Sequence, residues 1–222
     1  MVRCFCPCYL EPGDGFGCGH LSRATCRTAK SFGVRSHQYA HSVSIGDLCH
    51  DQGGKPDEKA VILAEGYFKR LLAIDPDNAM ARVMYGSVLT MKARDTLWPL
   101  TQIKYVKAGN REMDAAVKIA PKDAQVRLAR AVNNFHMPDI MGRAEIVQED
   151  LAWLWQQAQL ADTKLDVGQK QTIALRYGQI LQKKNKLDEA IKIWRAGLAL
   201  APKSQDADPL KGQLTKYNAR LK

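Results

Sequence analysis

The densest group of side chains capable of chemistry lies at the start of the sequence, where all six cysteines fall within 49 residues. Thiolates together with His20 could form a small metal site. The first three cysteines, however, follow a C-x-C-x-C spacing, whereas zinc sites usually use C-x₂-C pairs. Two other interpretations stay open, namely an irregular extension and a mis-assigned start or reading frame. The cysteines are Cys4, Cys6, Cys8, Cys18, Cys26 and Cys49.

Few other residues are arranged for catalysis. Asp47 and His50 would share a helix face and, with Asp51, could bind a metal ion or transfer protons. His136 is expected to pack or to cap the end of a helix, where the helix dipole favours an imidazolium. No metalloprotease, phosphate-loop, dinucleotide-binding or serine-hydrolase motif occurs in the chain. We therefore predict a protein that is not an enzyme and needs no cofactor or metal.

A cluster of arginines is the best candidate for binding another molecule. Arg127, Arg130 and Asn134 are spaced i, i+3 and i+7, which places them on one helix face, and Arg143 and Trp153 follow nearby. Arginine forks on a concave surface would suit the carboxylates of an acidic peptide or a chain terminus, and an exposed tryptophan could anchor a partner. The alternative is pairing inside the chain. The acids considered for it are Asp123, Glu145, Glu149 and Asp150.

The composition is that of an ordinary soluble domain with a basic excess. The net charge of +10 comes mostly from residues 56–222, where Lys/Arg and Asp/Glu alternate as on solvated helix faces. Without a compact basic cluster among aromatic residues, we expect no specific nucleic-acid binding. No apolar stretch reaches the roughly 18 residues of a membrane span. A cytoplasmic location is expected, or a periplasmic or exported one if the N-terminus is not native.

Elements that could position these residues are amphipathic helices joined at prolines. Apolar residues recur with helical spacing on both sides of three such joints. The residue before a proline is displaced from the helical region, so each joint ends one helix before the next begins. The joints are Asp75-Pro76-Asp77-Asn78, Ala120-Pro121-Lys122-Asp123 and Ala201-Pro202-Lys203-Ser204. This regular recurrence indicates an internal repeat.

Residues 171–204 resemble the 34-residue tetratricopeptide repeat (TPR). The first helix has large and small residues at the positions typical of the repeat. The second helix has a small residue, then an aromatic one, then a small one, again at the typical positions. A proline closes the repeat. The matching positions are Ala174, Tyr177, Gly178, Leu181, Ala190, Trp194, Gly197 and Pro202. The irregular central region is also similar to an uncharacterised group of bacterial TPR-containing proteins.

The earlier copies of the repeat depart from the pattern. Gly86 lies 35 residues before Pro121, where the pattern expects 24. About eleven extra residues around 95–107 therefore lengthen a helix or form an inserted turn. The unit at 124–161 is a divergent hairpin with its joint at 137–139. Its Trp153 and Trp155 project about 200° apart on a helix, so one of them should be partly exposed.

The sequence thus predicts an all-α, TPR-like α-α superhelix of about three and a half helical hairpins. We expect residues 1–44 to be irregular or disordered, 45–205 to form the repeats, and 206–222 to form a capping helix. The resemblance implies an adaptor or scaffold that binds a partner peptide or helix on its concave surface. One alternative is a structural subunit that self-associates. Another is a metal- or thiol-dependent regulator that uses the N-terminal cysteines.

Overall fold

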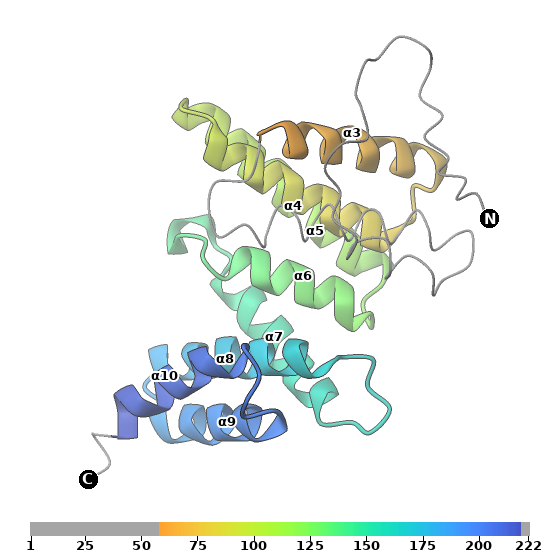
Figure 1. The fold of residues 1–222 in the computed structure, drawn as a ribbon. Coiled ribbons are helices and arrows are strands. Elements are labelled where there is room, and N and C mark those ends of the chain that lie inside the picture. The colour runs from red at the N-terminus through yellow and green to blue at the C-terminus, as the bar shows by residue number, and fades with distance from the viewer. Residues whose placement is uncertain (1–57, 219–222) are drawn as a thin grey trace, which may run out of the picture.

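The computed structural model describes residues 58–218, and within this range every regular element is a helix (Figure 1). The elements are α3 (Glu58–Ile74), α4 (Ala79–Asp95), α5 (Pro99–Ile119), α6 (Ala124–Asn134), η2 (Asp139–Met141), α7 (Ala144–Ala158), α8 (Val167–Lys183), α9 (Leu187–Leu200) and α10 (Ala207–Asn218). The predicted N-terminal cysteine segment, and Asp47, His50 and Asp51 with it, lie outside the described residues.

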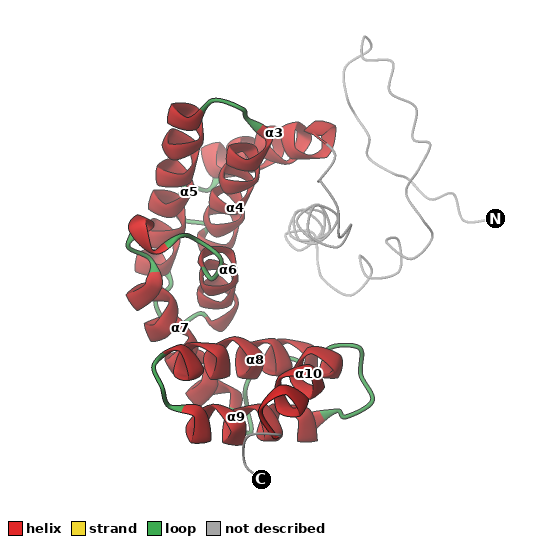
Figure 2. Cartoon of the chain, turned by 90° about the vertical axis from the view of Figure 1, so that its left-hand side faces the viewer, coloured by secondary structure: helices red, strands yellow, loops and turns green. Residues whose placement is uncertain are grey.

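The helices pair into antiparallel hairpins that stack along the chain. The hairpins are α4–α5, α6–α7 and α8–α9, with α3 packed on α4 before them and α10 packed on α9 after them. In the two upper hairpins, the first helices α4 and α6 lie in one layer and the second helices α5 and α7 in another (Figure 2). The predicted helical solenoid is therefore confirmed.

Each hairpin shares a small hydrophobic core with its neighbours. One cluster joins α3 to α4 around Phe68, the next joins α4, α5 and α6 around Met113, and a third joins α6, α7 and α8 around Leu154. The last joins α8, α9 and α10 around Trp194. Such a series of local cores is how a solenoid is stabilised, because each unit buries its faces only against adjacent units.

The first and second helices of the hairpins begin differently. Asn78, Asp123 and Asp166 precede α4, α6 and α8, and each side chain accepts hydrogen bonds from the backbone N–H groups of the first turn. The residues at the same position before α5, α7 and α9 are Trp98, Arg143 and Lys186, and none of them makes a side-chain cap. A good N-cap stabilises a helix by about 1 kcal/mol. The turns within the hairpins therefore lack a stabilising feature that the turns between hairpins have.

The repeat at residues 171–204 has the close packing that its sequence predicted. Trp194 is fully buried in α9, and its indole N–H donates to the carbonyl of Leu175 in α8 at 3.1 Å. A side chain at Gly178 would overlap the Trp194 ring, and one at Gly197 would overlap Ala174. Only glycine therefore permits this separation of α8 and α9.

The eleven extra residues lengthen both helices of the first hairpin. A Cβ atom at Gly86 would meet the Gly109 carbonyl oxygen at 2.6 Å and Met113 at 2.7 Å, so Gly109 and Met113 take the places of Ala190 and Trp194. Counted from Gly86 and Gly178, α4 continues four residues further than α8. Counted back from Gly109 and Ala190, α5 begins seven residues earlier than α9. Both turns keep three residues, 96–98 and 184–186. The hairpin therefore projects one to two helical turns beyond the others.

The C-terminal helix α10 covers the end of the stack, as a capping helix should. Leu210, Leu214 and Tyr217 are buried against α8 and α9, and the Tyr217 ring stacks on Trp194 with centroids 5.7 Å apart. The turn before α10 is held by Gln171, whose buried amide donates to the carbonyl of Ala201 at 3.1 Å. Closing the last apolar face in this way is what solubility of a solenoid end requires.

Candidate functional site

Two of the predicted partner-binding arginines hold a buried carboxylate. Asp150 of α7 is fully buried, and it accepts hydrogen bonds from Arg127 at 2.8 Å and from Arg130 at 2.8 and 2.9 Å. The guanidinium of Arg127 also lies over the Trp153 ring, 4.8 Å from its centroid. These contacts join α6 to α7 within one hairpin, which is the internal pairing that the sequence left open.

Asp114 of α5 extends this arrangement into an ion network. It accepts two hydrogen bonds from Arg143, at 2.7 and 2.9 Å, and one from Arg130 at 3.0 Å. Burial raises the pKa of the Asp114 carboxyl, but the hydrogen bonds and charges of Arg143 and Arg130 outweigh burial and hold the pKa below its usual range. The same network raises the pKa of Arg130 despite its burial. We call Arg127, Arg130, Arg143, Asp114 and Asp150 the ion network.

The three residues predicted to share a face of α6 stand at positions that hold apolar or aromatic residues in the best-matched repeat. Arg127, Arg130 and Asn134 precede Ala174, Tyr177 and Leu181 by the same 47 residues, so both sets face the second helix of their own hairpin. Asn134 is buried, and neither its amide nitrogen nor its amide oxygen has a hydrogen-bond partner among the described residues. The common face predicted for these residues is thus real, but it points into the hairpin.

The two neighbouring tryptophans of α7 are both half-buried. Trp153 packs on the α6–α8 cluster beneath Arg127, whereas Trp155 touches that cluster and the next one around α9. Partial exposure of one of the two tryptophans was expected, because their side chains project in nearly opposite directions from the helix. Whether Trp153 or the arginines bind a partner stays a prediction.

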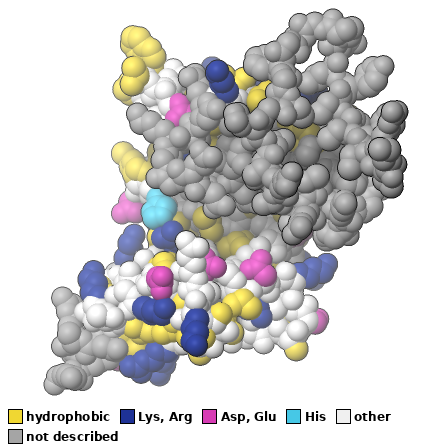
Figure 3. Space-filling view, viewed as in Figure 1, with side chains coloured by type: hydrophobic (Ala, Val, Ile, Leu, Met, Phe, Trp, Pro, Cys, Tyr) yellow, Lys and Arg dark blue, Asp and Glu magenta, His cyan; other side chains and the backbone are white. Residues whose placement is uncertain are grey.

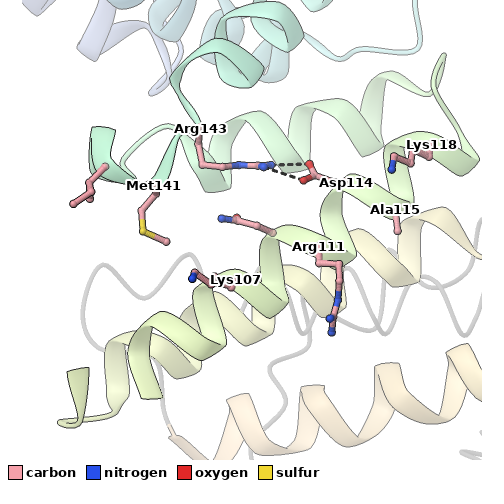
Figure 4. A pocket seen from close by; sticks show the side chains of 9 residues that line it. Lys107, Arg111, Asp114, Ala115, Lys118, Met141 and Arg143 are labelled. Carbon is pink, nitrogen blue, oxygen red and sulfur yellow. Dashed lines mark hydrogen bonds and ion pairs between the residues drawn. The ribbon is translucent and has the colours of Figure 1, made fainter. Parts of the chain in front are cut away.

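A surface groove adjoins the ion network where α5 faces η2 and the start of α7. Its volume is about 490 Å³. Arg143 reaches across to Asp114 at one wall, and Met141 lies opposite α5 (Figure 4). The lining residues are Lys107, Asn110, Arg111, Asp114, Ala115, Lys118, Ile140, Met141 and Arg143.

The groove carries an excess of positive charge. Lys107, Arg111 and Lys118, which we call the α5 cations, are exposed and spaced i, i+4 and i+11, so they follow one face of α5. Among the described residues, no carboxylate forms an ion pair with any of them. The acid that lines the groove, Asp114, is neutralised by Arg143 and Arg130. Within residues 58–218, the cations of the groove are therefore uncompensated.

The groove also offers apolar surface. Ile140 is 93% exposed, which is unusual for so large an aliphatic side chain. Asn110 is buried in the groove floor, and its Oδ1 atom accepts no hydrogen bond from a described residue. This oxygen is itself buried, so it is not open to a segment bound in the groove. Sequence reasoning overlooked the α5 cations and Asp114, although the helical spacing of the cations was visible in residues 99–119.

A second basic group lies where α6 ends against α8. Arg176 is half-buried with its guanidinium over the Phe135 ring, 4.6 Å from the centroid, and burial lowers its pKa. Burial, Arg176 and Lys183 also lower the pKa of His136. Burial and these two cations therefore disfavour the imidazolium that the helix end was expected to favour.

Within residues 58–218, no three His, Cys, Asp or Glu side chains are grouped so that they could hold a metal ion. In the same range, no helix is long and apolar enough to cross a membrane. The hypothesis of a metal site at the N-terminal cysteines concerns residues outside this range.

The chain resembles a protein of known structure. A thermophilic TPR protein of Thermus thermophilus aligns with a TM-score of 0.54 and 16% identity, over 89% of this chain and 97% of that chain. No protein-family model matches the sequence. No curated protein matches it either. At this identity the likeness concerns the fold, which is TPR-like as the sequence predicted.

Proposed function

We propose that the chain is a protein-interaction adaptor or scaffold and that the groove between α5 and η2 binds an acidic segment of its partner. Protein binding is the general role of the TPR-like fold, and such folds are typically non-enzymatic. The observation that carries the proposal is the row of three α5 cations without a carboxylate partner among the described residues.

The chemistry of the groove favours a peptide with both acidic and apolar side chains. Carboxylates spaced along a segment would pair with the α5 cations, while an apolar residue would cover Ile140 and Met141. The ion network supports this surface, because Asp114 fixes Arg143 as the wall of the groove.

Charge reversal tests the proposal. In the full chain, Lys107→Glu, Arg111→Glu and Lys118→Glu would be combined and compared with Arg70→Glu, Lys192→Glu and Lys203→Glu, three exposed cations elsewhere. Fluorescence anisotropy would measure binding of labelled peptides that combine Asp or Glu with Leu and Ile. We expect binding that weakens with salt, is lost in the groove variant and is kept in the control.

A partner captured from the source cells should show the same dependence and be displaced by the peptide that binds best. Equal binding by the two variants would contradict the proposal, and so would no binding by the native chain. The alternative, a structural subunit that self-associates, predicts a different result. Light scattering would then show a concentration-dependent mass that falls in the groove variant.

A further inference from the structure

The turns within the hairpins form an edge with an unusual surface. In a stack of antiparallel hairpins, the turns inside hairpins face one edge and the turns between hairpins face the opposite edge. The α4–α5 and α6–α7 turns lie on the same side of the stack, at the left of Figure 1. We call residues 96–98, 135–143 and 184–186, with Leu100, the hairpin-turn edge.

This edge exposes large apolar side chains at its most prominent point. Leu97 is 92% exposed, Trp98 75% and Leu100 83%, all at the tip of the lengthened α4–α5 hairpin. Hydrophobic side chains project on this side of the molecule, at the left of Figure 3. Because the extra residues carry these side chains beyond the rest of the stack, a flat surface would meet them first.

The two edges also differ in charge. The four described turns between hairpins, 75–78, 120–123, 159–166 and 201–206, contain six Asp and three Lys. The hairpin-turn edge contains one Asp against one Arg and two Lys, of which Arg143 is paired with Asp114 and Lys186 with Glu189. Beside its tip, Arg94, Asp95 and Lys104 are exposed. The molecule is therefore polarised, with its apolar tip at the more basic edge.

Two residues of the hairpin-turn edge stand at helix starts where other residue types would stabilise the helix better. Trp98 and Lys186 stand at the starts of α5 and α9, where Asp, Asn or Ser would cap the helix and where a cation opposes the helix dipole. The corresponding positions at the opposite edge hold Asn78, Asp123 and Asp166, which do cap their helices. Pro99 favours the start of α5, but neither Trp98 nor Lys186 is explained by helix capping.

We propose that the hairpin-turn edge docks on an anionic lipid bilayer. Trp98 would sit at the level of the headgroups, where its amphipathic ring is favoured, and Leu97 and Leu100 would enter the acyl boundary. Lys184 and Lys186 would strengthen binding through their attraction to anionic headgroups, and Lys186 would exchange its exposed ion pair with Glu189 for that contact. This is peripheral attachment, and it leaves the groove between α5 and η2 open to a protein partner. It does not rest on the proposed function of that groove.

Vesicle flotation with the full chain tests the inference. Vesicles of phosphatidylcholine alone would be compared with vesicles that also contain phosphatidylglycerol. We expect the native chain to float with the anionic vesicles and to be released by salt. Trp98→Ser should weaken binding roughly tenfold or more, as expected for a large apolar side chain withdrawn from the acyl boundary. The paired substitution Lys184→Gln and Lys186→Gln should weaken binding to the anionic vesicles alone.

The matched controls lie at the opposite edge. Ile74 is 78% exposed at the end of α3, so Ile74→Ser removes a comparable apolar surface, and Lys122→Gln with Lys203→Gln removes two exposed charges. These variants should float as the native chain does. Absence of flotation by the native chain would overturn the proposal, and so would equal losses in test and control variants. A dimer that Trp98→Ser converts to a monomer would instead identify the edge as a contact between copies.

Discussion

The guanidinium of Arg130 in α6 donates two hydrogen bonds to the fully buried carboxylate of Asp150 in α7, from Nε at 2.8 Å and from Nη2 at 2.9 Å. Arg127 donates to the same carboxylate from the preceding turn of α6. Two cations thus share one acid in the interior of a hairpin. In the best-matched repeat, the equivalent places are held by Ala174 and Tyr177.

Removing the shared acid should destabilise the fold strongly. Asp150→Ala leaves the buried Arg130 and the half-buried Arg127 without the carboxylate that they share, and breaking a buried pair in this way costs about 3–5 kcal/mol. Urea unfolding followed by circular dichroism would measure the loss. The neighbouring Glu149→Ala is the control, because Glu149 is 72% exposed and lies 3.9 Å from Arg127. A similar loss in both variants would mean that the buried network is not what stabilises this hairpin.

Close packing of α8 on α9 predicts a contrast between two glycines. Gly178→Ala would place a methyl group on the Trp194 ring, and overpacking of this kind costs about 1–3 kcal/mol. Gly212→Ala in α10 meets open space and should stabilise the chain by about 0.5–1 kcal/mol, because alanine favours a helix. Thermal unfolding of both variants would measure the two opposite shifts. Stabilisation by Gly178→Ala would contradict the described packing.

The lowered pKa of the Asp114 carboxyl predicts that the contribution of Asp114 to stability depends on pH. A carboxyl whose folded-state pKa is depressed contributes fully above its ordinary pKa, and the contribution is lost as pH falls through the folded-state pKa. The difference in unfolding free energy between the native chain and Asp114→Asn should therefore be constant from neutral pH to about pH 5 and shrink below about pH 4. Urea titrations across this range would measure it. A difference unchanged at lower pH would mean that the charge of Asp114 is not what stabilises the native chain.

The sequence could predict the hairpins because their signals are local. The residues from Ala174 to Pro202 match the TPR pattern without a gap, and the prolines and capping residues at 75–78 and 120–123 mark where helices end and begin. The helical solenoid predicted from these signals is confirmed by the fold, and the C-terminal capping helix was predicted from the apolar spacing of Leu210, Leu214 and Tyr217.

The candidate site was harder to predict, because it depends on contacts between distant residues. Arg127, Arg130 and Asn134 form a charged and polar helix face, and such a face is usually solvated. Asp114, which pairs with Arg130 and Arg143, lies in a helix whose register is concealed by eleven extra residues. The regular repeat spacing would place residue 98 opposite Gly86, but in the structure Gly109 lies there. With this correction, α5 matches the second helix of the repeat and its cations fall along one face.

Substitution at the start of α5 should separate stability from the proposed membrane attachment. Trp98 has the extended backbone of an N-cap, and its side chain is 75% exposed, so Trp98→Asp would add a capping acceptor and lose little packing. We expect a gain of about 1 kcal/mol in unfolding free energy, measured by urea titration. The same variant should fail to float with anionic vesicles, because a carboxylate is repelled by the headgroups. A variant that is more stable and still binds vesicles would show that Trp98 is not the attachment point, while a less stable variant would show that the indole packs on the chain.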